Sequence, residues 1–559
     1  MPDASLQPGR GLLAWPEERA GDAGSALVPI AVLLISAALL ALFFEGPTDL
    51  LPPAALFASV LATAATLAVA RRLPPRWVFA APPVAIPWVA GLACLALGGL
   101  AGTFWPNSGD EHSYLFLADT LLKGRLTNPA APDPELFAMY RVFTLRGQTF
   151  SQYLPGWPMA LAPFRVLGAP WLANPALTVL LGFCLLGALR RLRAPVSFQA
   201  PALMLVLLNP FTLFNGASLF SGTLSAALAA GLVSLQLADE ERPSLARRLG
   251  IGALFGFQLL ARAEMFVLLG GLYAADRLLR RRGAALRDAI PIALGILPFA
   301  LFLLVFDRTI TGNPFQTPMT LTNPDLQLGS VLDDPAATAA LGARHLDYWV
   351  SCLGAYGGLA LLVISGPALA FKARRGEIRF FDLALPATIA FFLFLPYSGG
   401  HQYGPRYWFP AWPLAILTLG SGFVRGDGAF EMLGRRFDFR TLAAANLLFC
   451  AAVTPGLAVT TRGYIDLRRI VFADSVPVRP AIVLVPNRGI KVWPWHRLLI
   501  AANSRDFARN DVDYKDAILY GRLDAPDSVA RACRLDGRAV FVWRGPGDLD
   551  RQDCGPPEP

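Results

Sequence analysis

Apolar stretches of membrane-spanning length recur along the chain from residue 27 to residue 460. Several reach the ~18–20 apolar residues that a helix needs to cross about 30 Å of hydrocarbon. Composition agrees, because 54% of the residues are hydrophobic and only 16% are charged, against about 25% charged in an average soluble domain. The sequence therefore predicts an all-α polytopic membrane protein with about thirteen transmembrane helices. The expected spans are 27–44, 51–70, 84–104, 170–189, 200–214, 219–237, 249–260, 265–278, 289–306, 346–371, 380–397, 407–424 and 441–460.

Positive charge is concentrated in short runs next to these stretches. The net charge of +9 would also suit nucleic acid, but no soluble basic face joins the runs, so we expect no nucleic-acid partner. Arginine pairs beside apolar spans are typical of cytoplasmic loops. The runs are Arg71-Arg72, Arg190-Arg191, Arg247-Arg248, Arg280-Arg281-Arg282, Arg374-Arg375 and Arg435-Arg436.

The orientation of the chain follows from these runs. A cytoplasmic tail of residues 1–26 and an odd number of spans place every arginine run in a cytoplasmic loop. The same parity places the first long loop, residues 106–156, and the end of the chain outside. We therefore expect a multi-pass protein embedded in the lipid bilayer of a bacterial-type inner (plasma) membrane, with its N-terminus in the cytoplasm.

The composition changes after residue 460. Residues 27–460 are expected to form the transmembrane domain, whereas residues 461–559 are richer in charge and carry short β-like runs. This pattern predicts a small extracytoplasmic α/β domain. Cys533 and Cys554 lie within it, and an oxidising compartment favours a disulfide between them, with two free thiols as the alternative. The β-like runs are 481–485, 517–520 and 539–543.

The first outer loop carries adjacent acids, Asp110 and Glu111, followed by His112. A carboxylate beside a membrane surface can act as a general base toward an acceptor hydroxyl within hydrogen-bonding reach. Adjacent acids at a helix start diverge by about 100°, so one would be the base and the other would orient or cap. Helix capping is the competing interpretation, because Ser108 and the acids precede an apolar-periodic run and acids suit a first helical turn. From the residue types alone, capping is the stronger of the two.

Two further segments interrupt the pattern of spans. Residues 153–167 are apolar but short and contain three prolines, which favours an interfacial or re-entrant helix on the outer side. Between 249–260 and 265–278, Arg262 and Glu264 break an otherwise continuous apolar run. Charges at membrane depth face a polar cavity or each other, so a substrate site and a local ion pair are equally open.

Residues 401–407 form a polar turn between two expected spans at the outer boundary. Gly404-Pro405 predicts a tight turn, and Arg406 would lie at the lip of the next span. A guanidinium there can bind phosphate in bidentate fashion; the alternative is an arginine that extends to lipid head groups. His401 and Tyr403 are further substrate-binding candidates in this turn.

The histidines do not predict a metal centre. His112, His345, His401 and His496 all map to the outer side, and with the acid pair they could in principle hold a divalent cation. No HxH, HExxH or CxxC spacing exists. We therefore expect no cofactor, with a divalent metal as the weaker alternative.

The order of motifs in the first outer loop resembles that of the GT-C glycosyltransferases. An acid pair follows the third span, and then come YLFLADTLLKGRL and QYLPGWPMALAPF. The later HQYGPRYWFPAWPLAIL and LLARAEMFVLLG are similar to the same superfamily, as is a small outer domain after many spans. Enzymes of that family use polyprenyl-phosphate-linked sugars, and the first acid of the pair is their catalytic carboxylate. The resemblance therefore implies that Asp110 is the catalytic base.

The resemblance also implies the reaction, an inverting transfer of a sugar from a polyprenyl-phosphate donor to an acceptor hydroxyl on a glycan, lipid or protein. Arg406, together with Arg262, would hold the lipid phosphate, while Glu111 and His112 would orient Asp110. A polytopic transporter or flippase of envelope lipids or glycans is the main alternative, favoured by the interrupted pair of spans. A non-catalytic envelope scaffold is the third.

Overall fold

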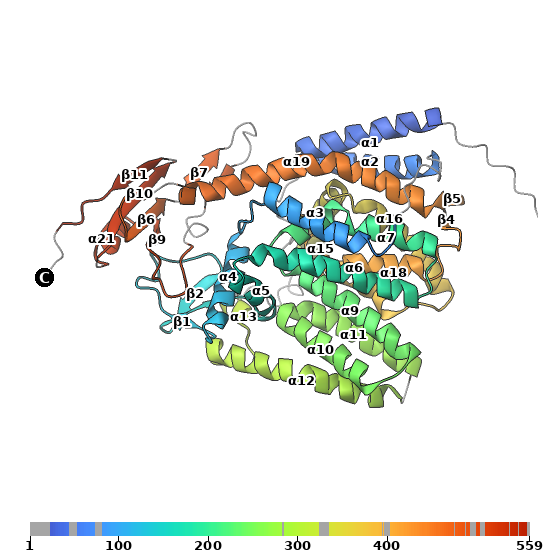
Figure 1. The fold of residues 1–559 in the computed structure, drawn as a ribbon, viewed down its shortest axis with the longest axis horizontal. Helices are drawn as coiled ribbons and strands as arrows, with labels where there is room; N and C mark the ends of the chain where they lie inside the picture. Colours follow the sequence, from blue (N-terminus) through green and yellow to red (C-terminus); the bar gives the residue numbers. More distant parts are fainter. Residues whose placement is uncertain are drawn as a thin grey trace, which may run out of the picture.

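The computed structural model is a body of packed helices with a small α/β domain at one end (Figure 1). The first outer loop, with α4 and β1 to β3, lies between the helices and this domain (Figure 1). The structure describes residues 23–43, 53–72, 81–281, 284–323, 335–393, 395, 403–473, 476–486, 488–491, 499–502, 509–535, 537–545 and 547–555.

The elements alternate between long apolar helices and short connecting ones. The helices up to residue 261 are α1 (Ala23–Phe43), α2 (Pro53–Arg72), α3 (Ile86–Leu100), α4 (Gly109–Leu122), α5 (Gly156–Val166), η2 (Pro170–Leu172), α6 (Ala173–Arg191), α7 (Val196–Leu207), α8 (Pro210–Ala217), α9 (Gly222–Glu241) and α10 (Leu245–Ala261). The later helices are α11 (Ala263–Arg281), α12 (Ala284–Thr311), α13 (Pro318–Thr322), α15 (Pro335–Ala355), α16 (Leu359–Arg374), α17 (Phe380–Leu393), η4 (Trp412–Leu414), α18 (Ala415–Gly420), α19 (Phe439–Ala473) and α21 (Ser528–Cys533). The strands are β1 (Asn128–Pro129), β2 (Val142–Leu145), β3 (Gln148–Ser151), β4 (Ala429–Met432), β5 (Arg435–Asp438), β6 (Ala481–Pro486), β7 (Arg488–Lys491), β8 (Leu499–Ala502), β9 (Ile518–Leu523), β10 (Ala539–Gly545) and β11 (Asp548–Arg551).

The long apolar helices make this a multi-pass membrane protein. Among the described residues, five helical segments are long and apolar enough to cross a bilayer, or up to seven if each of two bent pairs counts as one span. The expected number of about thirteen is therefore not confirmed, because several expected spans are shorter or broken helices. The five segments are Ala55–Arg72, Pro170–Arg191, Gly222–Glu241, Ala285–Thr311 and Phe439–Gly463.

Two of the expected spans are bent pairs of helices. Residues 200–214 extend over α7 and α8, which meet at 56°, and residues 346–371 extend over α15 and α16, which meet at 113°. Pro210 cannot donate the backbone bond that would continue α7, and the side chain of Asn209 caps the new helix. Gly357 follows α15 with φ +72°, a left-handed conformation that is readily adopted by glycine and ends a helix.

The expected span 407–424 is not a continuous helix. Turns occupy most of residues 403–411, and only the short η4 and α18 follow. Prolines at 405, 410 and 413 interrupt the backbone bonding that a long helix needs. Trp408 and Trp412 are nevertheless almost completely buried, so this segment is a packed part of the protein core.

The first outer loop is a folded unit. After α4 comes a sheet with the strand order β1-β3-β2, in which neighbouring strands are antiparallel. The helix α5 then packs against α4. Residues 153–167 thus contain the short helix expected there, and its interfacial placement stays a prediction.

The C-terminal domain contains the expected strands. Its sheet has the order β11-β10-β6-β9, with β6 parallel to both β9 and β10 and with β11 antiparallel to β10. The long helix α19 enters this domain, since it continues to Ala473, past the boundary expected at residue 460. A disulfide joins Cys533, the last residue of α21, to Cys554, and the expected bridge is confirmed.

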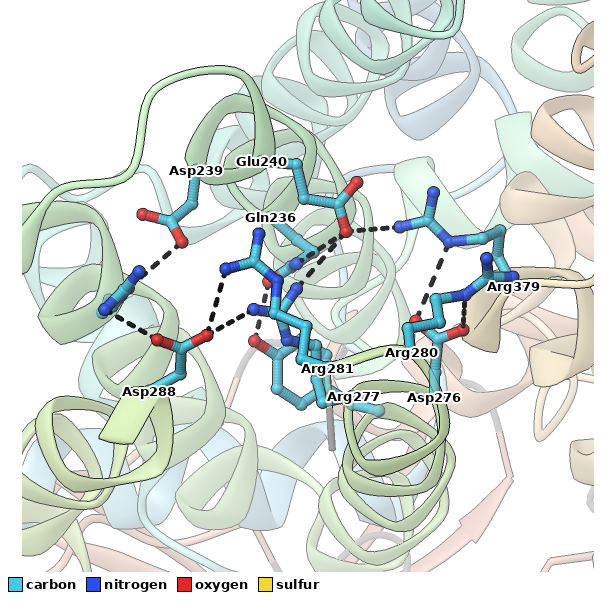
Figure 2. Close-up of polar contacts among 11 residues, drawn as sticks. Gln236, Asp239, Glu240, Asp276, Arg277, Arg280, Arg281, Asp288 and Arg379 are labelled. Carbon is cyan, nitrogen blue, oxygen red and sulfur yellow. Dashed lines mark hydrogen bonds and ion pairs between the residues drawn. The ribbon is translucent and has the colours of Figure 1, made fainter. Parts of the chain in front are cut away.

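A network of ion pairs joins the ends of several helices (Figure 2). Asp288, near the start of α12, lies 2.7 Å from Arg277 of α11. Its other partners are Arg248 of α10 at 2.8 Å and Arg281 of α11 at 3.3 Å. The helix α10 runs from this network to a break at Arg262, and α11 runs from that break back to the network. The network therefore joins the two helix ends that lie opposite the break in the α10–α11 hairpin.

Candidate active site

A cavity of about 350 Å³ opens between the first outer loop and the transmembrane helices. Its walls come from α4, the segment after β3, the α10–α11 break, α13, the end of α17 and the 403–407 turn. Phe391 and Phe392 of α17 form an apolar side. Among the described residues, the charged side chains that line it are Asp110, Arg141, Arg262, Glu264 and Arg406.

The start of α4 decides which of the adjacent acids faces this cavity. Ser108 caps the helix, because its Oγ accepts a bond from Glu111 N at 3.2 Å, and the Glu111 carboxylate accepts one from Ser108 N at 3.0 Å. Glu111 also accepts from Leu219 N at 2.6 Å and is 1% exposed. The capping interpretation is therefore confirmed for Glu111, which is not among the described residues that line the cavity. Asp110, directed about 100° away, lines it.

Three described side chains hold Asp110. Arg406 Nη2 lies 3.2 Å from its Oδ2, Tyr153 Oη donates a hydrogen bond to its Oδ1, and Arg141 Nε lies 3.7 Å from the same oxygen. Burial by itself would raise the pKa of Asp110. The charges of Arg406 and Arg141 and the hydrogen bond from Tyr153 outweigh burial and hold this pKa below its usual value. Asp110 is therefore an ionised carboxylate near neutral pH.

Arg406 is presented by a left-handed turn. Tyr403 has φ +64° and Gly404 has φ +82°, a conformation that costs a non-glycine residue about 1–2 kcal/mol. Tertiary bonds hold Tyr403 in it, since Asn107 Nδ2 donates to its Oη at 2.8 Å and Asn215 Nδ2 donates to its carbonyl oxygen at 3.0 Å. The bond from Asn107 ties the Arg406 turn to the turn that precedes α4.

The break between α10 and α11 brings Arg262 and Glu264 to the same cavity. Arg262 ends α10 with an extended backbone, at φ −154° and ψ 92°. Its Nε lies 2.6 Å from Glu264 Oε1, and its guanidinium carbon lies 5.5 Å from the ring centroid of Tyr407. One of the two expected alternatives, a local ion pair between Arg262 and Glu264, is therefore present. Because both side chains also line the cavity, the other alternative, a substrate site, stays open.

Of the remaining predicted residues, His112 and Tyr403 are described and do not line the cavity. Burial, with the charges of Arg509 and Arg165, lowers the pKa of His112 to about 3, so its ring is neutral. No described residue hydrogen-bonds its Nε2, and the expected contact with Asp110 is not made by any described bond. Tyr403 instead stabilises the Arg406 turn through the bonds that it accepts from Asn107 and Asn215. His401 lies outside the described residues.

Two residues that contact Asp110 were not predicted from the sequence. Tyr153 belongs to the QYLPGWP motif, and that motif was the available signal. Arg141 is one of three separate arginines in the first outer loop, with Arg125 and Arg146, and no local pattern distinguishes it. It has φ +61°, its carbonyl oxygen accepts a bond from Ser113 Oγ at 2.8 Å, and its Nη1 donates to Asn323 Oδ1 at 3.3 Å. Only the packing of α4 and α13 around it brings its side chain to the acid.

Metal ligands do not gather in this part of the molecule. Within the described ranges, no group of three or more His, Cys, Asp or Glu side chains is placed to hold a metal ion. His496, like His401, falls outside those ranges. The two acids among the described residues of the cavity, Asp110 and Glu264, are paired with arginines.

No protein-family model matches the sequence, and no curated protein matches it. Among solved structures, the chain is similar to ArnT from Cupriavidus metallidurans in the apo state, with a TM-score of 0.48, 11% identity, and 82% of this chain and 91% of that chain covered. It is also similar to ArnT bound to undecaprenyl phosphate, with a TM-score of 0.47, 11% identity, and 82% and 92% covered. For the Archaeoglobus fulgidus oligosaccharyltransferase in complex with Zn and sulfate, the TM-score is 0.43 at 14% identity, with 82% and 67% covered. Both proteins are members of the GT-C superfamily; at these identities the likeness by itself assigns no activity to this chain.

Proposed function

We propose that this protein is a membrane glycosyltransferase that moves a sugar from a polyprenyl-phosphate donor to an acceptor hydroxyl on the extracytoplasmic face. One observation carries the proposal. A single cavity, bounded on one side by apolar residues of α17, holds the ionised Asp110 together with Arg141, Arg262 and Arg406. A base, cations for a phosphate, and an apolar wall for a lipid chain are the parts that this reaction needs.

Asp110 is the general base of the proposed reaction. Arg406 and Tyr153 each engage one of its two oxygens, and each oxygen keeps a further lone pair that can accept a bond from an acceptor hydroxyl. The acceptor oxygen attacks the anomeric carbon and its proton passes to Asp110. Because the pKa of Asp110 is low, the proton moves late, when the new bond has already made the acceptor oxygen acidic.

Arg406 and Arg262 bind the departing lipid phosphate. Their guanidinium carbons lie 5.9 Å and 5.5 Å from the ring centroid of Tyr407, so both cations approach the same ring. The phosphate gains negative charge as its bond to the sugar breaks, and guanidinium groups placed there stabilise that charge. Phe391 and Phe392 on the apolar side suit the prenyl chain.

A single displacement with inversion is the favoured stereochemistry. A retaining reaction needs a second carboxylate that is available as a nucleophile. Glu264 is the other acid among the described residues of the cavity, and its carboxylate is paired with Arg262 at 2.6 Å. We propose on this basis that Asp110 acts as the base of a single displacement.

The test is turnover of undecaprenyl-phosphate-linked sugars by purified protein in nanodiscs. Asp110→Asn is expected to lower kcat at least about 100-fold while the donor still binds. Asp119→Asn is the matched control, since Asp119 lies on the same helix and pairs with Arg165 at 2.7 Å. An Asp110→Asn protein that inserts, folds and turns over at the wild-type rate rules out the base. Lipid or glycan flux that requires Arg262 but not Asp110 favours a flippase instead.

The proposed sidedness has its own test. Arg146 lies between β2 and β3 of the first outer loop, so a cysteine placed there can be labelled by a membrane-impermeant maleimide. Labelling from outside intact cells is expected. Labelling only after access from the cytoplasm overturns the proposed orientation.

A further inference from the structure

The C-terminal domain and the first outer loop share one hydrophobic core. Arg522 N donates to the carbonyl oxygen of Leu136 at 2.8 Å, so the loop runs along β9. Each partner covers apolar side chains that the other would leave in water. The loop contributes Phe116, Leu136, Phe137 and Val142 to this core, and the domain contributes Ile482, Leu484, Tyr514, Leu519 and Val540.

Charged contacts surround this core. Arg125 Nη2 lies 2.6 Å from Asp513 Oδ1. On α21, Arg531 contacts Asp133 and lies 2.7 Å from Glu135 Oε2. Partly exposed pairs of this kind contribute little stability each, but together with the core they define how the domain sits on the loop.

One arginine of the domain reaches the turn from which α4 begins. Arg509 Nη1 donates to the carbonyl oxygen of Pro106 at 2.9 Å, and its guanidinium carbon lies 5.3 Å from the ring centroid of Trp105. Arg469, on the helix that leads into the domain, lies 5.5 Å from the same ring. The domain thus binds the chain four residues before Asp110.

We propose that Arg509 is a positioning residue for Asp110. By binding the Pro106 carbonyl, it fixes the turn from which α4 starts and thereby the direction in which the Asp110 carboxylate enters the cavity. This inference rests on the proposed function. It makes the C-terminal domain a part of the catalytic apparatus, although no residue of the domain is among the described residues that line the cavity.

The effect reaches Asp110 through Glu111. The amides of Asn107 and Ser108, directly after Pro106, donate to the Glu111 carboxylate. Burial raises the pKa of Glu111, and the charge of Arg509 acts in the opposite direction and favours the ionised form that accepts these bonds. Loss of Arg509 therefore loosens both the Pro106 carbonyl and the cap of α4.

Steady-state kinetics test this role in the full-length protein. Arg509→Ala is expected to lower kcat roughly 10- to 100-fold with the donor KM nearly unchanged, and Arg509→Lys to recover most of it, because an ammonium group still donates to a carbonyl. Arg544→Ala is the control, since Arg544 pairs with Asp550 on the β10–β11 hairpin of the same domain. Wild-type kcat in Arg509→Ala, while Asp110→Asn is inactive, overturns the inference and leaves the proposed function standing. A loss that only follows the folded fraction also overturns it.

Hydrogen exchange supplies a readout that needs no activity. The amides of Asn107, Ser108 and Leu219 donate to Glu111, and they are expected to exchange faster in Arg509→Ala than in Arg544→Ala. Unchanged exchange overturns the positioning role even if no donor is turned over. Absence of transfer by the wild-type protein overturns the proposed function alone.

Discussion

Arg406 Nη2 lies 3.2 Å from Asp110 Oδ2, although 296 positions separate the two residues in the chain. The contact joins the start of α4 in the first outer loop to the left-handed turn at Tyr403 and Gly404, which lies between α17 and α18 along the chain. It keeps the acid ionised, and it places a cation where the proposed reaction releases a phosphate. Both residues are more than four-fifths buried, with 17% and 14% of their side chains exposed.

Arg406 is expected to control affinity for the lipid phosphate. Arg406→Lys keeps the charge but loses the fork that binds phosphate through two nitrogens, so binding of undecaprenyl phosphate should weaken about tenfold, and more in Arg406→Ala. Native mass spectrometry or calorimetry of the purified protein measures this. Arg425→Ala, which alters an exposed pair with Glu431, should bind like the wild type. Equal affinity in Arg406→Lys contradicts a bidentate contact.

The pH profile is expected to reflect the low pKa of Asp110. A general base acts when ionised, so kcat/KM should fall only below about pH 4, where an ordinary aspartate titrates. Tyr153→Phe removes a bond to the ionised form, which raises the pKa and moves the acid limb to higher pH. The measurement is log kcat/KM against pH for both proteins. A limb that stays in place means that Tyr153 does not hold the reacting carboxylate.

Glu111→Gln is expected to damage folding, whereas Asp110→Asn mainly damages turnover. The Glu111 oxygens accept bonds from the amides of Asn107, Ser108 and Leu219, and glutamine would oppose one of them with its own N–H groups. The cost should be roughly 1–3 kcal/mol, seen as earlier thermal unfolding. Glu111→Gln with wild-type stability and selectively lost chemistry would instead make Glu111 a participant in the reaction.

The ion-pair network of Figure 2 is expected to stabilise the α10–α11 hairpin. Asp288→Asn removes the nearer of the two carboxylates beside Arg277, whose side chain is 7% exposed and keeps only the 3.4 Å pair with Glu240 among its described ion pairs, and should destabilise the protein by roughly 3 kcal/mol. Glu431→Gln breaks an exposed pair with Arg425 and should cost only about 0–1 kcal/mol. Thermal unfolding in the same detergent compares them. Equal effects would mean that the network contributes no more than a surface pair.

Local patterns in the sequence determined several features of this protein. Ser108 and the acids ahead of an apolar-periodic run predicted the cap of α4, and the runs after residue 480 predicted β6, β9 and β10. Two cysteines in a domain that is expected to lie outside the cytoplasm predicted the disulfide. Each of these features depends on residues a few positions apart or on composition, so it can be predicted from the amino-acid sequence alone.

The tertiary structure decided which groups meet. Sequence periodicity could not tell that Asp110 enters the cavity while Glu111 turns into the core, because that depends on where Leu219 packs. It could not place Arg141 or Arg509, whose contacts with Asp110 and Pro106 join distant segments. The expected count of about thirteen spans is not confirmed, and hydropathy did not register the bends at Asn209 and Gly357, which lie within two of the expected spans. Long-range packing sets these contacts, and no local rule encodes them.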